Sequence, residues 1–558
     1  MSKPRKKKKS PKRVLGLPDL EQAKSAVLNT LTSVSGQRTY DHAINDFVEW
    51  YCGCYETHQE SPGVRPTRRM RDTAIMAIQS DSSSGSTRRE WLTGVSAAMS
   101  ASSAASAQTG GDVKRPNIVL IISDQFRWDC VGAMGLNPVN LTPNLDAMAG
   151  HGVLFRSAFS NQPVCAPARG SIFTGQYPSR HGVWHNGAGL AENATTLATE
   201  LGQAGYSTNY IGKWHLAPGE GRPRAEVQGA VAPAYRGGFR DLWEASNELE
   251  WTSHAYEGDL YDNDGKPIHF SGQYRVDFMT GLAQRFLRSA RSPFLLVVAY
   301  LEVHHQNDTD TYDPPKEYAH RYPNPFIPQD LRALPGSWPS QLSDYYACVA
   351  RIDDAAGSIR KTLEETGLDR NSILVFMSDH GCHFKTRNTE YKRSPHESSI
   401  HIPLIIEGPG FNKSLEIPEL VSQVDLAPAL LEAAGVAVPA SMQGHSFLGL
   451  LDRRTEGWRN EVYFEMSEFV TGRGLRTPRY TYAAAAPKAP GWRPVPKADR
   501  YVEYALYDHG ADPYQHVNLA GRAPYAKTAE ELRQRLIARI KEASGASAAV
   551  EPCWFPYP

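Results

Sequence analysis

The 558-residue chain lacks a net charge, a cysteine framework and any long apolar run. Lysine plus arginine number 60, as do aspartate plus glutamate, so composition gives no general indication of a nucleic-acid partner. The seven cysteines are odd in number and without framework spacing, which argues against a disulfide scaffold. The longest apolar run, Pro293–Leu301, is far shorter than the ~20 residues of a membrane-spanning helix. We therefore expect no membrane span.

The first 75 residues differ from the rest and are treated as an N-terminal extension. Residues 3–13 form a basic run, which is usually solvated and less often contacts nucleic acid. Two candidate helices follow, one opening at Leu17–Lys24 and one over Tyr40–Tyr51, where apolar residues have helical spacing. This stretch resembles the core-binding helices of phage-type tyrosine recombinases but contains no catalytic motif. DNA binding is kept as an alternative, and a nucleic-acid partner is not expected for the main function.

Residues 76–111 are rich in serine and alanine and resemble a twin-arginine export signal. Arg88 and Arg89 precede a weakly apolar stretch that ends in the small-x-small pattern Ala105–Ala107. Because the segment is internal, it acts as a signal only if translation starts near Met76, and the protein would then be periplasmic or otherwise exported. Otherwise the same composition serves as a flexible linker, and the protein is cytoplasmic.

From about Pro116 short apolar runs alternate with helical stretches. The candidate strands are Asn117–Ile122, Phe294–Tyr300, Ile373–Met377 and Pro403–Ile406. With a helix over Tyr345–Glu365, this alternation predicts an α/β domain over residues 112–450, whose mostly parallel sheet is covered by helices on both faces. Residues 451–558 are expected to form a smaller C-terminal subdomain, with a short antiparallel sheet and a helix at Thr528–Ala543.

One cysteine has an unusual context. Cys165 opens the run Cys-Ala-Pro-Ala-Arg, which includes Pro167 and Arg169. Because proline suits the first position of a helix, Cys165 is expected just before a helix N-terminus. The free N–H groups and the dipole there stabilise a deprotonated nucleophile or a bound sulfate or phosphate. Taken alone, a single cysteine is more often a buried structural residue.

Polar pairs stand at or near the ends of three predicted strands: Asp124-Gln125, His304-His305 and Asp379-His380. In open α/β sheets ligands bind outside the carboxyl ends of the strands, so these side chains are expected to meet. One aspartate after a strand is commonly a helix cap, but two such aspartates together with Cys165 and Arg169 indicate a site. Two carboxylates with a further donor suit a hard divalent cation: Ca²⁺, with Mg²⁺ or Mn²⁺ as alternatives.

The Cys-x-Pro-x-Arg pattern and the segment Gly212–Leu216 (Gly-Lys-Trp-His-Leu) resemble signature segments of the sulfatases, over roughly residues 115–525. The resemblance implies an alkaline-phosphatase-like fold and hydrolysis of a sulfate ester to an alcohol and inorganic sulfate. In that family a formylglycine-generating enzyme oxidises the cysteine to Cα-formylglycine, whose hydrate is the nucleophile. The implied substrate is a sulfated small molecule or carbohydrate.

The resemblance also implies individual roles. The implied Ca²⁺ ligands are Asp124, Gln125, modified Cys165, Asp379 and His380. The implied catalytic residues are Cys165, Arg169, Lys213, His215, His304 and Lys392. The two lysines would stabilise the transferring group, and His304 or Lys392 would protonate the leaving alcohol. Arg169 would hold the hydrate, and His215 would act as a base.

Two departures from the family pattern leave alternatives open. Many sulfatases carry a second aspartate where this chain has Gln125, which removes one negative charge from the metal site. This pairing resembles the branch of choline sulfatases and phosphonate monoester hydrolases, so a phosphonate monoester or phosphodiester hydrolase is the alternative activity. The usual Pro-His-x-Pro context is also missing around His304, and His305 is the fallback.

An inactive relative retained for binding is a third interpretation. The loops 220–251 and 307–338 are expected to line the pocket.

Overall fold

The computed structural model describes residues 115–219, 221, 224–488 and 493–553. The predicted N-terminal extension with its recombinase-like stretch, and the twin-arginine-like segment, lie outside the described residues.

The core of the described chain is an 11-stranded mixed sheet. Its strand order is β13 (Leu415–Ile417), β2 (Val153–Phe155), β12 (Leu404–Glu407), β10 (Ser372–Ser378), β1 (Asn117–Ser123), β9 (Phe294–Tyr300), β4 (Ser207–Lys213), β5 (Leu242–Ser246), β7 (Glu257–Tyr261) and β6 (Ser253–His254), with β8 (Pro267–Ser271) paired to β7. The centre, from β10 through β1, β9 and β4 to β5, is parallel. This confirms the predicted mostly parallel α/β sheet.

The strand predicted at Pro403–Ile406 forms, as β12, but it runs antiparallel to β10. A parallel neighbour needs a crossover that carries the chain back along the sheet, usually as a helix. The one helix between β10 and β12 is the four-residue α13 (Glu397–Ile400), which is too short for such a crossover. It re-enters the sheet from the end at which it left, so the strand direction reverses.

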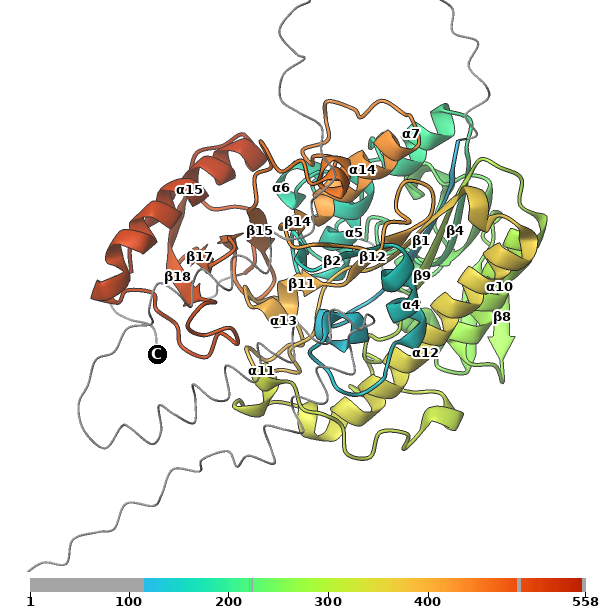
Figure 1. Cartoon of the computed structure of the whole chain (residues 1–558), viewed down its shortest axis with the longest axis horizontal. Helices are drawn as coiled ribbons and strands as arrows, with labels where there is room; N and C mark the ends of the chain where they lie inside the picture. Colours follow the sequence, from blue (N-terminus) through green and yellow to red (C-terminus); the bar gives the residue numbers. More distant parts are fainter. Residues whose placement is uncertain (1–114, 220, 222–223, 489–492, 554–558) are drawn as a thin grey trace, which may run out of the picture. The chain divides into compact units, whose positions relative to one another are not determined.

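Alternation along β1 produces two apolar layers. Ile118, Leu120 and Ile122 belong to one buried cluster, and Val119 and Ile121 belong to the other. The first layer lies under α5 (Cys165–Thr174), α7 (Leu197–Gln203) and α14 (Leu426–Ala433). The second lies under α4 (Pro143–His151), α10 (Arg275–Ser289) and α12 (Trp338–Thr366) (Figure 1). Helix α12 begins earlier than the predicted Tyr345, because Pro339 in its first turn fits a helix start.

The C-terminal subdomain has its own five-stranded sheet of β15 (Val462–Met466), β16 (Gly472–Arg476), β17 (Tyr480–Ala485), β18 (Arg500–Asp508) and β19 (Ala549–Glu551). The first four strands are antiparallel, as predicted, and β19 adds a parallel edge. Helix α15 (Ala526–Ser544) buries Leu532, Leu536 and Ile540 against this sheet.

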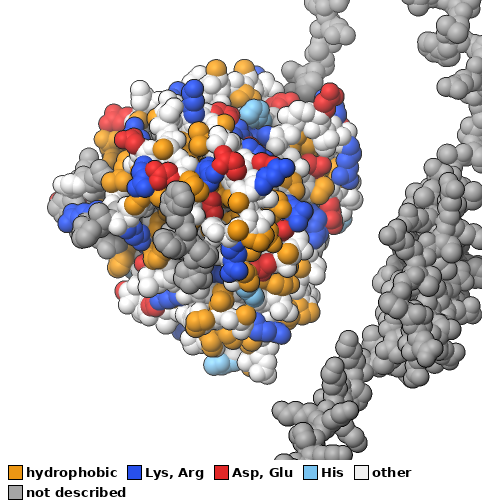
Figure 2. All heavy atoms as spheres, turned by 90° about the vertical axis from the view of Figure 1, so that its left-hand side faces the viewer, with side chains coloured by type: hydrophobic (Ala, Val, Ile, Leu, Met, Phe, Trp, Pro, Cys, Tyr) orange, Lys and Arg blue, Asp and Glu red, His pale blue; other side chains and the backbone are white. Residues whose placement is uncertain are grey.

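Smaller elements complete the described chain. A three-stranded sheet consists of β11 (His401–Ile402), β3 (Ala158–Phe159) and β14 (Val421–Ser422). The remaining short α-helices are α6 (Pro178–His181), α8 (Arg224–Val227), α9 (Leu249–Thr252) and α11 (Gln329–Arg332), and single 3-10 turns connect several of the other elements. Among the described residues, none of the helices combines the length and apolar character needed to cross a bilayer. Acidic and basic side chains are interspersed on the face shown in Figure 2.

Candidate active site

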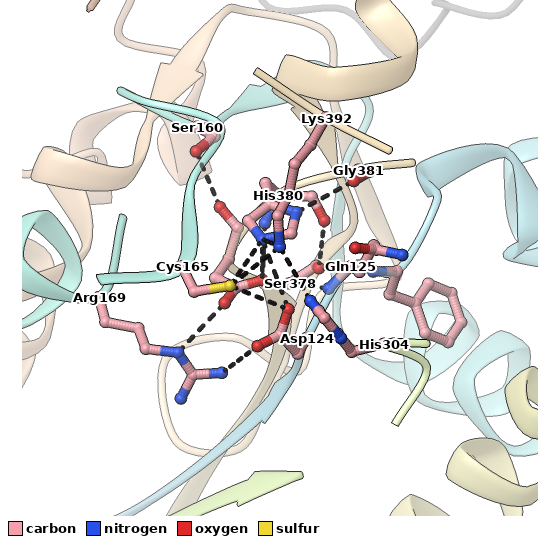
Figure 3. Close-up of polar contacts among 12 residues, drawn as sticks. Asp124, Gln125, Ser160, Cys165, Arg169, His304, Ser378, His380, Gly381 and Lys392 are labelled. Atoms are coloured by element: carbon pink, nitrogen blue, oxygen red, sulfur yellow. Dashed lines mark hydrogen bonds and ion pairs between the residues drawn. The ribbon is translucent and has the colours of Figure 1, made fainter. Parts of the chain in front are cut away.

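The side chains that follow β1 and β10 meet the first turn of α5. The Cys165 Sγ atom lies 3.5 Å from Asp124 Oδ1 and 3.3 Å from His380 Nε2. With Asp379 these residues form a fully buried cluster whose candidate ligand atoms all lie within 4.8 Å of one another (Figure 3). The expected meeting of strand ends therefore occurs, because β1 and β10 are parallel neighbours in register and end side by side.

Cys165 is the first residue of α5, with Val164 as its N-cap. The prediction that Pro167 opens the helix was wrong by two positions, since Pro167 is its third residue. A proline is tolerated there because the first four N–H groups of a helix have no intrahelical acceptor. The side chain at Cys165 therefore starts from the helix N-terminus, where the helix dipole favours an anion.

Arg169 binds both of the aspartates that follow β1 and β10. Its guanidinium, fully buried, donates to Asp124 Oδ2 at 3.2 Å, to Asp379 Oδ2 at 3.1 Å and to the carbonyl oxygen of Lys213 at 2.8 Å. Each carboxylate is therefore held through one oxygen, while its Oδ1 lies nearer His380. Arg169 is thus placed to orient the acidic residues as well as to neutralise them.

Lys213 enters the site from the end of β4. Its Nζ atom lies 2.9 Å from Asp124 Oδ2 and 3.0 Å from Glu250 Oε1. Gly212, with φ of +106°, allows the close approach of β4 to β9: a Cβ atom there would lie 2.2 Å from the carbonyl oxygen of Ala299. The glycine before Lys213 is therefore required by the packing that delivers this lysine.

Glu250, on α9, is a site residue that the motif analysis missed. It is buried, and beside its contact with Lys213 it lies 3.8 Å from His215 Nδ1. Gln306 donates to the Glu250 carbonyl at 2.8 Å and fixes this turn. The only sequence signal was the prediction that the loop 220–251 lines the pocket, because an isolated glutamate belongs to no motif. His215 itself adopts a φ of +62°.

Lys392 contacts Cys165 and two histidines of the site. Its Nζ atom lies 3.0 Å from Cys165 Sγ and 3.1 Å from both His304 Nε2 and His380 Nε2. The neighbouring His305 instead stacks on Tyr391 and approaches the Gln125 side chain. Of the two histidines left open by the sequence, His304 is therefore the one beside Lys392 and Cys165.

The C-terminal subdomain closes one side of the site through the turn between β15 and β16. Glu468 accepts from the Asn186 backbone N–H at 2.7 Å and pairs with Arg393 at 2.6 Å. Asn186 in turn accepts from the N–H of Ala166, next to Cys165. One carboxylate thus ties the segment carrying Lys392 to the start of α5.

Comparison with known proteins identifies the architecture. The sulfatase family model matches residues 116–436, and the model described as N-sulphoglucosamine sulphohydrolase, C-terminal, matches residues 389–542. The chain belongs to the sulfatase family. An ulvan-active sulfatase of Formosa agariphila is 30% identical, with 77% of this chain and 81% of that protein covered. An arylsulfatase of Clostridium perfringens is 27% identical, with 76% and 95% covered.

Solved structures agree on the fold of this sulfatase. The yidJ protein of Bacteroides fragilis matches with a TM-score of 0.68 at 25% identity, covering 78% of this chain and 98% of its own. A phosphonate monoester hydrolase of Agrobacterium radiobacter matches with a TM-score of 0.58 at 22% identity, covering 77% and 96%. The family membership confirms the prediction of a sulfuric ester hydrolase.

The electrostatics of the sulfatase site favour an anion at Cys165. Burial opposes ionisation of the thiol, but Lys213, Lys392 and His380 outweigh it, so the pKa of Cys165 lies well below its usual value. Burial likewise opposes ionisation of Asp124, yet the surrounding cations lower its pKa. Asp379 shows the opposite direction, because burial and the neighbouring Asp124 carboxylate raise its pKa.

The residues of the sulfatase site fit a divalent cation. Arg169 binds the Oδ2 atom of each buried carboxylate, which leaves the two Oδ1 atoms on the side of His380 as candidate ligands. Burial, with the Asp124 carboxylate adding to it, raises the pKa of Asp379, and a bound cation would offset both effects. The Oε1 atom of Gln125 is buried without a hydrogen-bond partner, while its Nε2 donates to Tyr312 at 2.9 Å. This oxygen is thus available as a neutral donor in the position where an aspartate was expected.

Proposed function

We propose that this sulfatase hydrolyses a sulfated carbohydrate after Cys165 has been converted to formylglycine. The observation that carries the proposal is the position of Cys165, on the first turn of α5 and within 3.5 Å of Asp124, His380 and Lys392. The hydrated aldehyde would supply a hydroxyl nucleophile that an unmodified thiol cannot replace. The carbohydrate preference draws support from the ulvan-active relative.

Asp124, Gln125, the converted Cys165, Asp379 and His380 are proposed to hold Ca²⁺, with Mg²⁺ or Mn²⁺ as alternatives. The cation would supply positive charge for the nucleophile and for the sulfate oxygens. Lys213 and Lys392 would stabilise the transferring group, because both cations lower the pKa of Cys165 and the Nζ atom of Lys392 lies 3.0 Å from its Sγ atom.

Protons would be moved by the groups around Lys392 and Glu250. His304 and Lys392 lie 3.1 Å apart, and either can protonate the leaving alcohol oxygen. His215, beside the Glu250 carboxylate, is placed to accept a proton from the nucleophile. Arg169 keeps the two aspartates oriented throughout.

Mass spectrometry of the peptide containing Cys165 tests the proposal. The protein is produced with and without a co-expressed formylglycine-generating enzyme, and sulfate-ester hydrolysis is measured on both preparations. We expect the aldehyde and the activity to appear together. An unmodified thiol in a fully active preparation would overturn the proposal.

The metal site has a test that does not depend on turnover. Removing divalent ions with a chelator takes away a ligand that binds only the folded chain, so Tm is expected to fall and to recover when Ca²⁺ is added. Recovery with Mg²⁺ or Mn²⁺ instead would reassign the ion. No change in Tm on either treatment would contradict a metal site.

A phosphonate monoester or phosphodiester hydrolase remains the second candidate, favoured by Gln125 in place of an acidic ligand. A sulfate monoester, a phosphonate monoester and a phosphodiester each carry one negative charge, so the charge of the substrate does not separate the two activities. Rates on matched aryl sulfate, aryl phosphonate monoester and aryl phosphodiester substrates distinguish the two activities. The main proposal requires the sulfate to react fastest.

Export through the segment 76–111 is also proposed, with a start near Met76 and cleavage near Ala107. N-terminal sequencing of the mature protein from its native host decides this, and a chain that begins at Met1 would refute it.

A further inference from the structure

A cavity of about 190 Å³ lies between the catalytic domain and the C-terminal subdomain, away from the residues assigned to catalysis. Its walls come from the segment after β1, from the residues around α11, from Arg387 and α13, and from the loop after β18. None of the proposed metal-binding or catalytic residues lines it. The cavity is therefore a candidate for a second binding site.

The acidic groups that line this cavity are already paired. Asp129 and Asp330 both contact Arg127, at 2.5 Å and 2.9 Å. Glu397 pairs with Arg476 at 2.6 Å and with His401 at 2.9 Å. These carboxylates therefore need no further cation.

Arg387 is different, because only neutral groups hold its guanidinium. It donates to the carbonyl oxygens of Gln515 and Tyr514, each at 2.7 Å, and among the described residues no carboxylate forms an ion pair with it. Burial lowers the pKa of Arg387, although Tyr507 and the nearby acidic residues Asp330 and Asp512 act in the other direction. A half-buried cation without an ion-paired carboxylate is stabilised by a bound anion.

Three polar atoms of the lining residues are buried without a hydrogen-bond partner: Arg387 Nε, Ser398 Oγ and Gln515 Nε2. The two nitrogens are donors, and the hydroxyl can donate. Such groups destabilise a folded protein when they remain unpaired. A ligand that brings acceptor oxygens would offset this cost.

Most of the remaining lining residues are apolar or aromatic, among them Trp128 and Phe326. Leu136 and the Tyr514 ring are the exposed members, at 46% and 41%. A cavity of roughly 150 Å³ holds one benzene molecule, so this volume is on the scale of one ring, whose substituents would lie at the exposed rim beside Tyr514 and Leu136. It is too small for an oligosaccharide, since pockets for drug-sized ligands start near 300 Å³.

We propose that this cavity binds one sugar ring that carries an oxyanion, with the oxyanion at Arg387 and Gln515 and the ring face on Tyr514. The oxyanion is a carboxylate or a sulfate, two groups with the same acceptor chemistry. The site is separate from the catalytic centre, and it does not depend on conversion of Cys165.

The test measures binding by calorimetry on the full chain with Cys165→Ala, which cannot turn over a sulfate ester. The probes are glucuronate, glucose 6-sulfate and neutral glucose. We expect at least one anion to bind with one-to-one stoichiometry and at least tenfold more tightly than glucose. The ratio between the two anions identifies the preferred oxyanion. Failure of both anions to bind would overturn the proposal without affecting the sulfatase activity.

Gln515→Glu separates this site from the catalytic centre. The substitution keeps the Oε1 that accepts from the Glu397 N–H at 2.6 Å, and it puts a negatively charged oxygen in place of the unpartnered Nε2, in the same cavity wall as Arg387. We expect the anion affinity to fall at least tenfold, while Tm stays the same or rises. Gln203→Glu, an equal charge change at an exposed position of α7, serves as the control.

An unchanged affinity in Gln515→Glu would place the binding elsewhere and refute the assignment. If this variant folds poorly, Tyr514→Ala replaces it, because the Tyr514 ring is exposed and its loss should weaken binding of the sugar ring without unfolding the chain.

Discussion

The pKa of Cys165 lies below its usual value although the side chain is completely buried. Three cationic or basic side chains, Lys213, Lys392 and His380, cause this shift. Such an environment is required for an ionised nucleophile of any kind, whether sulfur or oxygen. The neighbours of Cys165 therefore support its conversion product as well as the thiol itself.

Replacing Cys165 by serine tests the need for two hydroxyl groups on one carbon. A serine hydroxyl can accept the sulfuryl group when the leaving alcohol departs, but it has no second hydroxyl to expel sulfate. We expect Cys165→Ser to stop after one event and to gain the mass of one sulfuryl group, as seen by intact-protein mass spectrometry. Cys553→Ser is the control. Steady turnover by Cys165→Ser would be incompatible with the mechanism.

Glu250 is expected to position Lys213 and His215 rather than to touch the substrate. Glu250→Gln keeps the shape of the side chain but removes the charge that faces both groups. Loss of such a supporting contact typically costs about 10- to 100-fold in activity. We expect kcat to fall by this factor with a smaller change in KM, and the pH profile of kcat to shift.

The matched control is Glu257→Gln, an exposed glutamate on β7. If both variants retain wild-type kcat and pH profile, Glu250 has only a structural role. Recovery of activity in Glu250→Asp would strengthen the positioning role, since the charge is restored.

At the scale of elements, the site depends on where strands stop. β1 and β10 end at Ser123 and Ser378, which are register partners, so Asp124 and Asp379 follow side by side. Helix α5 then brings Cys165 and Arg169 from one turn to the same point. The geometry thus follows from a parallel register and one helical turn.

The β15–β16 turn is predicted to act on Lys392 through Glu468. Glu468→Gln breaks the ion pair with Arg393, the residue next to Lys392, and weakens the bond to Asn186. We expect kcat to fall about tenfold, with Tm nearly unchanged. A double-mutant cycle with Arg393→Gln should show a coupling energy of about 1 kcal/mol in kcat.

Glu551→Gln provides the control for this cycle, because it removes an exposed ion pair with Arg500 in the same subdomain. Equal effects of the two glutamate variants on kcat would show that the subdomain acts only through its general stability.

For the whole molecule, buried histidines predict sensitivity to acid. Burial lowers the pKa of His383 to about 3 and that of His396 well below 6.5. Between pH 6.5 and the folded pKa, the unfolded chain binds more protons than the folded chain. The contribution to stability is complete above pH 6.5 and is lost as pH falls.

For each of these histidines, the free energy of unfolding is expected to be about 2 kcal/mol lower at pH 5 than at pH 7.5. Denaturant unfolding at several pH values measures the slope. His396→Gln should reduce it, whereas His269→Gln, at an exposed position on β8, should not. A free energy of unfolding that stays constant from pH 7.5 to 5 would disprove the prediction.

The sequence by itself determined the α/β layout and most of the candidate site, because these depend on local patterns. Apolar runs identified β1, β9, β10 and β12, and the Cys-x-Pro-x-Arg motif identified Cys165 and Arg169. Helix boundaries were less well predicted, as α5 and α12 show, because a proline fits several positions of a first turn.

Only the tertiary structure decided the reversed direction of β12, the choice of His304 beside Lys392, and the parts played by Glu250 and Glu468. Glu468 lies more than 300 positions from Cys165, and its contacts exist only because the C-terminal subdomain packs against the start of α5. Motifs record residues that act through local spacing. A contact between distant segments depends on how the layers of the fold pack. Such a contact has no local pattern of periodicity or spacing from which the sequence could predict it.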